Sequence, residues 1–215
     1  MSGGYAQWGR GGNAVADLSH WRNVTLNVSQ LFHYTSLQGG TGGRRGGDST
    51  FDMSYGTNLR FTAQVWEGFT LIGGPGGSAA IPNGQGGDAL FTFDYGQRLS
   101  FSSPEVFSSA QITGGEGNNQ NATGGDALLS MRYCSDVTFS AQEVFRDLTI
   151  QGGSGTTFSG TATLDMSHGT NLSFTAPRVL SRMVIAGQFG GGLLLNASGL
   201  RNIPANTFYG TIMDG

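Results

Sequence analysis

The chain has 215 residues, of which 38 are glycine, a share far above the usual ~7%. Charged residues make up 12% and the formal net charge is −3, so no basic stripe is present of the kind that nucleic-acid binding needs. No apolar stretch approaches the ~18 residues of a membrane span, the single Cys134 excludes an internal disulfide, and the N-terminus lacks the apolar core of a signal peptide.

A glycine-rich segment, residues 1–15, opens the chain, and a 22-residue unit then recurs five times with nearly fixed spacing. The copies span 16–37, 51–72, 91–112, 129–150 and 164–185, and a degenerate sixth copy fits 193–213. Glycine-rich connectors separate the copies. Repeats that cannot bury their own apolar face must stack on their neighbours, which predicts one domain over residues 1–215.

The copy at 51–72 shows how one unit is built. Phe51, Met53 and Tyr55 alternate with polar residues, which predicts a half-buried strand. After a short turn, a second strand has Phe61 facing inward, and a third ends at Ile72. The pattern favours an all-β parallel β-helix, or β-solenoid, of about six coils with three short strands each and glycine-rich loops on one edge. A β-sandwich is the alternative fold.

Equivalent positions of the copies are expected to form rows along the solenoid. The predicted core columns are Tyr55, Tyr95, Tyr133 and His168; Phe61, Phe101, Phe139 and Phe174; and Ile72, Ile112, Ile150 and Ile185. The predicted turn ladder consists of Asn23, Asn58, Asp136 and Asn171, with Arg98 as the exception. Asn and Asp tolerate a left-handed backbone, and their side chains can stack from coil to coil.

One further column is a candidate cation site. Asp48, Asp88 and Asp126 each precede a first strand and would stack at ~4.8 Å, where a column of Ca²⁺ could bridge them. In the alternative interpretation each Asp caps its turn, and Arg44 and Arg45 partly neutralise the column. No other cofactor is expected.

Neither catalytic nor cofactor-binding residues can be assigned. Asp17, Asp52 and Asp165 form an outward column with no acid, base and basic partner gathered in one coil, so we expect no enzyme. Hydroxyl residues on the outward face of the second strand resemble the Thr-rich faces of ice-binding solenoids. His33 and the other histidines read as structural.

The layout resembles parallel β-helix repeat proteins of the surface adhesin and fibre type, and the GGDST and GGDAL segments resemble the GGA-type repeats of polymorphic surface adhesins. The resemblance implies an extracellular or cell-surface structural protein. Together with uncapped coils, it favours a subunit that stacks head-to-tail on itself into a filament. The alternatives are a monomeric binding module for carbohydrate or ice and, third, a polysaccharide-active enzyme. Glycans are a second expected partner; nucleic acid and a membrane span are not expected.

Overall fold

The computed structural model describes residues 1–31, 34–77, 82–175, 178–179, 183–186, 193–196 and 212–214. His33 and most of the expected sixth coil lie outside these residues. Every regular element in the described part is a β-strand, and every strand pairing is parallel. None of the described segments forms a helix long and apolar enough to cross a membrane.

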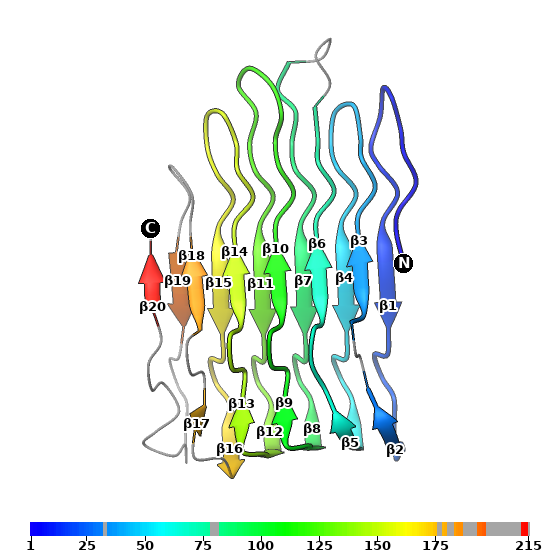
Figure 1. Ribbon diagram of the computed structural model, residues 1–215, viewed down its shortest axis with the longest axis vertical. Coiled ribbons are helices and arrows are strands. Elements are labelled where there is room, and N and C mark those ends of the chain that lie inside the picture. Colours follow the sequence, from blue (N-terminus) through cyan, green and yellow to red (C-terminus); the bar gives the residue numbers. More distant parts are fainter. Residues whose placement is uncertain are drawn as a thin grey trace.

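The strands form three long sheets and one short one (Figure 1). The first sheet contains β1 (Ala14–Asp17), β4 (Ser49–Asp52), β7 (Ala89–Thr92), β11 (Ala127–Ser130), β15 (Ala162–Asp165) and β19 (Leu193–Asn196). The second contains β2 (Thr25–Gln30), β5 (Thr57–Val65), β8 (Gln97–Ser102), β12 (Ser135–Ser140) and β16 (Thr170–Thr175). The third contains β3 (Ser36–Gln38), β6 (Thr70–Ile72), β10 (Gln111–Thr113), β14 (Thr149–Gln151), β18 (Val184–Ala186) and β20 (Ile212–Asp214). The short sheet contains β9 (Glu105–Val106), β13 (Glu143–Val144) and β17 (Arg178–Val179).

This topology confirms the predicted parallel β-solenoid and excludes the β-sandwich, because sandwich sheets are antiparallel. Five successive coils place a strand in each long sheet, and β19 and β20 belong to the next coil. Five coils thus have their full set of long-sheet strands within the described residues, and most of the expected sixth lies outside them. In the described part of the chain, three coils also have a fourth short strand at the corner between the second and third sheets, which the sequence pattern did not predict.

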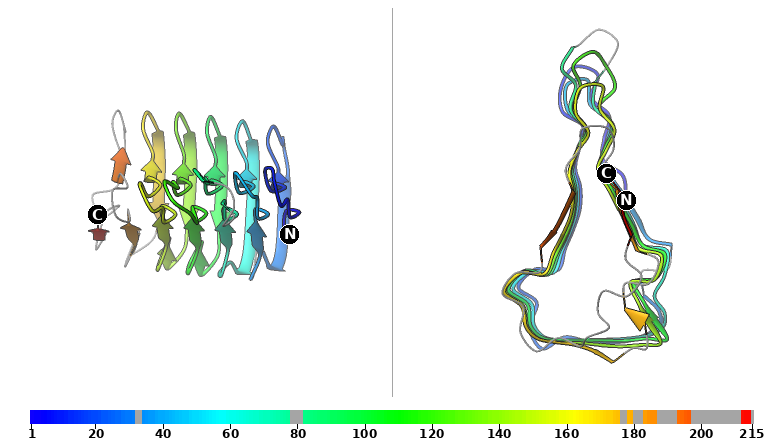
Figure 2. Two further views of the ribbon diagram at one scale, coloured as in Figure 1. Left: turned by 90° about the horizontal axis from the view of Figure 1, so that it is seen from above. Right: turned by 90° about the vertical axis from the view of Figure 1, so that its left-hand side faces the viewer.

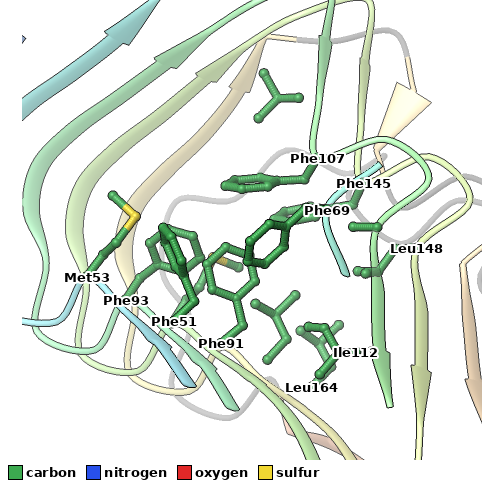
Figure 3. Close-up of a cluster of buried hydrophobic side chains, with 14 of the residues drawn as sticks. Phe51, Met53, Phe69, Phe91, Phe93, Phe107, Ile112, Phe145, Leu148 and Leu164 are labelled. Atoms are coloured by element: carbon green, nitrogen blue, oxygen red, sulfur yellow. The ribbon is translucent and has the colours of Figure 1, made fainter. Parts of the chain in front are cut away.

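The interior is a tapered stack of apolar side chains. Near the narrow edge, the first-sheet column holds small residues, Ala14, Ser49, Ala89, Ala127 and Ala162. Two residues further along, where the coil widens, Phe51 and Phe91 are buried and their rings meet edge to face at 5.1 Å (Figure 3). In the second sheet Phe61, Phe101 and Phe139 are buried and stack at 5.4 and 4.9 Å, which confirms this part of the predicted core column. Phe174 is in register with Phe139.

One predicted core column is shifted by one residue in the second coil. Leu71, not Ile72, pairs with Ile112 and is fully buried, whereas Ile72 is only half-buried. The third-sheet interior column is therefore Leu37, Leu71, Ile112, Ile150 and Ile185. The cause is one residue fewer at the corner of this coil: Arg60 pairs with Ser100, forty positions on, but Glu67 pairs with Ser108, forty-one positions on.

The glycine-rich connectors lie on one edge, as predicted, but their bases are packed rather than looped out. Seen end-on, the coils superpose as a broad base that narrows to a neck (Figure 2). Backbone N–H groups of glycines on one leg donate to glycine carbonyls on the other, at 2.8–2.9 Å. The series runs through Gly4, Gly12, Gly40, Gly47, Gly74, Gly87, Gly115, Gly125, Gly153 and Gly160. We call these residues, with the glycine next to each in the paired runs, the glycine neck.

Glycine is required along most of the neck because no space is left for a side chain; Gly4, in the first coil, is the exception. At Gly74 an added Cβ would overlap the Gly40 carbonyl oxygen, and at Gly87 it would overlap that of Gly47. Both obstacles are backbone atoms, which cannot move away as the end of a flexible side chain could. The high glycine content therefore encodes close packing of two backbones, not a flexible loop.

Candidate functional site

An aromatic ladder lies at the corner between the first and second sheets, and it corrects one predicted core column. His20, Tyr55, Tyr95, Tyr133 and His168 stack along the axis with ring centroids 4.7–5.0 Å apart and interplanar angles of 4–15°. The three tyrosines are 43–49% exposed, so the prediction that this column is buried is wrong. All five residues have φ near +60°, and this left-handed bend turns each ring out of the interior.

The predicted turn ladder lies three residues further along each coil. The Asn58 side-chain amide donates to the side-chain oxygen Oδ1 of Asn23 at 2.8 Å, and the Asn171 side-chain amide donates to the Asp136 carboxylate at 2.8 Å. All these residues have φ of 53–55°, a region in which Asn and Asp are the favoured non-glycine residues. Arg98 has the same φ of 53° but interrupts the row of amides.

The candidate calcium column is a hydrogen-bonded ladder. Each carboxylate accepts the backbone N–H of the next coil: Asp88 N to Asp48 Oδ1 at 3.0 Å, and Asp126 N to Asp88 Oδ1 at 2.9 Å. Arg45 adds ion pairs to Asp48 at 3.3 Å and to Asp88 at 2.9 Å, and Arg10 adds another to Asp48. Burial raises the pKa of Asp88. Each Asp thus caps the next coil rather than its own turn, and Arg44 forms no ion pair with a described residue.

No group of three or more His, Cys, Asp or Glu side chains that could hold a metal ion occurs in the described ranges. Asn13 takes the first place in the same column, where its side-chain oxygen accepts the Asp48 N–H at 3.0 Å. Because a neutral amide makes the same bond, the column's geometry follows from coil capping and needs no cation.

The outward column Asp17, Asp52 and Asp165 caps turns. Each carboxylate accepts the backbone N–H two residues on, at 2.8–2.9 Å. Hydrogen bonds from the hydroxyl and amide of Ser19 hold the pKa of Asp17 below its ordinary value. In the third coil this column holds Thr92, and Asp94, two residues further on, forms an ion pair with Arg132. The hydrogen bond from Arg132 to Asp94 raises the pKa of that guanidinium.

Cys134 is buried, and burial raises the pKa of its thiol to about 12. Its S–H donates to the Phe93 carbonyl at 3.1 Å. A thiol with this pKa is almost wholly protonated at neutral pH and is a poor nucleophile. His20 and His168 are the two ends of the aromatic ladder.

A polar groove of about 570 Å³ lies on the outer face of the second sheet, on β2, β5 and β8. It is lined by Asn23, Thr25, Asn58, Leu59, Arg60, Arg98 and Ser100. Arg60 and Arg98 are exposed, and neither forms an ion pair with a described residue. The hydroxyl positions on this sheet do not form an unbroken grid, because Arg60 pairs with Thr25 on one side and Ser100 on the other.

The first coil has an open edge. Among the described residues, no strand pairs with the free sides of β1 and β2. Inward side chains that are buried one coil later are consequently uncovered here: Val28 is 38% exposed, whereas its partner Ala63 is 5% exposed. Leu26 is half-buried, whereas its partner Phe61 is fully buried.

These features define a parallel β-solenoid repeat protein whose coils are held by side-chain rows in a broad body and by backbone contacts in a glycine neck. Comparison with protein-family models, curated proteins and solved structures gave no match, so the assignment to this class rests on the chain's own topology.

Proposed function

We propose that this β-solenoid is a structural, non-enzymatic subunit of an extracellular or surface filament, and that its copies stack end to end. The observation that carries the proposal is the open edge of the first coil. It combines unpaired strand edges with inward side chains, such as Leu26 and Val28, that are partly exposed. Unpaired edges of this kind are templates for pairing with another chain.

A second copy is the occupant that fits this edge. All strands in a sheet run in the same direction, so a further coil of the same protein would continue each ladder with the correct polarity and spacing. It would also bring an apolar interior of the same taper over Leu26. A contact between opposite ends of identical subunits does not close on itself, and its product is a filament.

The test is electron microscopy and sedimentation of the purified chain at increasing concentration, compared with an edge variant. Asn27 pairs with Thr62 in register. Arg60 donates its N–H to Val24, and because strand N–H groups alternate in direction, the N–H of Asn27 faces the free edge of β2. Asn27→Pro removes that donor, and proline is tolerated on an edge strand.

We expect wild-type filaments, and monomers of unchanged circular dichroism for Asn27→Pro. The matched control Asn27→Thr keeps the N–H and should still polymerise. A wild-type chain that remains monomeric at high concentration would contradict the proposal, as would an Asn27→Pro variant that polymerises normally. Hydrolysis of any member of a polysaccharide panel would contradict the non-enzymatic part.

A further inference from the structure

We propose that the groove on β2, β5 and β8 binds the carboxylate or sulfate groups of an acidic polysaccharide, with Arg60 and Arg98 as the anion-binding residues. The groove lies on the outer face of the second sheet and not on the free side of β2, where the next subunit would pair. The inference is therefore independent of filament formation.

The first argument is a double departure from the repeat. Position 98 belongs to a column in which every other described coil has Asn or Asp, and position 60 to one in which every other coil has Ser or Thr. Both columns change to arginine in neighbouring coils, and both arginines line the same groove. Two independent substitutions that converge on one surface indicate a shared role.

The second argument is that Arg98 is unfavourable for the fold. Its backbone is left-handed, with φ of 53°, and residues other than Gly, Asn and Asp adopt this region at a cost of about 1 kcal/mol or more. Arginine also breaks the row of amide contacts that joins Asn23 to Asn58 and Asp136 to Asn171. Arg98 weakens the stacking of the coils and forms no ion pair with a described residue that would offset this, so we infer that it is present to bind a ligand.

The third argument is electrostatic. Arg10, Arg45, Arg132 and Arg146 are all held in ion pairs, whereas Arg60 and Arg98 have no acidic partner in the described part of the chain. Arg22, one residue before Asn23, adds a third exposed positive charge. The strands β2, β5 and β8 contain no Asp or Glu. A protein with a net charge of −3 thus has a local positive patch with guanidinium groups available for bidentate binding.

The neutral lining favours a sugar polymer over a nucleic acid. Asn58, Thr25 and Ser100 supply amide and hydroxyl groups of the kind that bind sugar hydroxyls. Single-stranded nucleic acids bind through bases stacked on exposed ring faces. Here the neighbouring aromatic ladder covers its own faces, since its rings are stacked at 4.7–5.0 Å.

The experiment measures the affinity of the full chain for four probes: heparin as a sulfated polysaccharide, alginate as a polyuronate, dextran as a neutral polymer, and a single-stranded DNA oligonucleotide. We expect heparin or alginate to bind, with an affinity that falls as salt is raised because the charges are exposed. Which of the two binds identifies the anionic group. Equal binding of dextran, equal or tighter binding of DNA, or no binding of either acidic polymer would overturn the proposal.

The variants are chosen so that a ligand-binding role and a structural role have opposite signatures. Arg98→Asn restores the residue type of its column and should raise the melting temperature by about 2–4 °C, while affinity falls about tenfold through the loss of a charge-assisted hydrogen bond. Arg60→Thr should lower affinity by a similar factor without loss of stability. Arg44→Thr is the control, since it removes one exposed, unpaired arginine from a connector and should leave affinity unchanged.

Equal losses in Arg44→Thr and Arg98→Asn would mean that only net charge matters and would refute a defined site. Arg60→Lys and Arg98→Lys keep the charge but lose the planar fork, and they should bind better than the neutral variants and more weakly than the wild type. A drop in stability for Arg98→Asn would show that the arginine serves the fold, which would also overturn the proposal.

Discussion

The glycine neck and the apolar body stack the same coils by different physical means. In the body, ladders of strands are backed by rows of side chains such as Phe61, Phe101 and Phe139, which are fully buried. In the neck, glycine backbones bond directly across two legs at 2.8–2.9 Å, and no side chain takes part in the contact. The comparison teaches that one repeat can contain two kinds of packing with different tolerance. The body should accept apolar exchanges of similar volume, whereas the neck, apart from Gly4, should accept no added carbon atom.

The largest expected effect is the loss of a ring from the body. Phe101 is fully buried between Phe61 and Phe139, so Phe101→Ala leaves a cavity and should lower the free energy of unfolding by about 3–5 kcal/mol. Phe101→Leu, the control, fills most of the space and should cost about 1–1.5 kcal/mol. Denaturant unfolding measures both. If both variants lowered the free energy of unfolding equally, the stability contributed by this row of rings would not depend on the volume of the side chain.

A smaller but sharper effect is expected in the neck. Gly87→Ala places a Cβ on the Gly47 carbonyl and should cost about 2–3 kcal/mol, although only one carbon is added. Gly9→Ala is the matched control, because nothing lies within 4 Å of the added atom; its effect should stay within about 0.5 kcal/mol. Thermal melts of both variants test this. If Gly87→Ala has the same melting temperature as Gly9→Ala, the neck is not close-packed in solution.

The smallest effect marks the boundary between neck and body, where Asp88 follows Gly87. Burial raises the pKa of Asp88 above the ordinary aspartate value of 3.8, so the ionised carboxylate opposes folding at pH above the folded pKa. This opposition disappears as the pH falls below about 3.8, where both the folded and unfolded states are protonated. Asp88→Asn should therefore stabilise the protein at pH 7, by less than about 1 kcal/mol because solvent and Arg45 screen the charge.

Melting temperatures of Asp88→Asn and the wild type should converge as the pH is lowered from 7 to 3.5. Asn is a suitable replacement, since Asn13 already makes the equivalent hydrogen bond in the first coil. A lower melting temperature for Asp88→Asn at pH 7 would show that the ion pair with Arg45 outweighs the cost of burial.

Much of the fold could be predicted because equivalent residues recur at equal spacing. Phe61, Phe101 and Phe139 had to lie in register once each copy was assigned to one coil, and the bonds from Asn58 to Asn23 and from Asn171 to Asp136 follow from the same stacking. The candidate groove was missed. The signal was present in the sequence, since Arg60 and Arg98 both break the repeat, but their convergence on one face depends on how the columns of neighbouring coils lie beside each other.

The sequence by itself determined the coil, its parallel stacking and the interior row of Phe61, Phe101 and Phe139, because a period of two within strands and a fixed spacing between copies leave few other arrangements. Only the tertiary structure decided that the side chains of the tyrosine column face outward. Alternation within the strand predicts an inward side chain at Tyr55, but the left-handed backbone at this residue turns the ring out of the interior. It also decided that Leu71 replaces Ile72 in the core, since a one-residue deletion at a corner changes the register downstream. The glycine neck likewise needed three dimensions, because paired glycines permit both a loose loop and a close contact until the opposite backbone is in place.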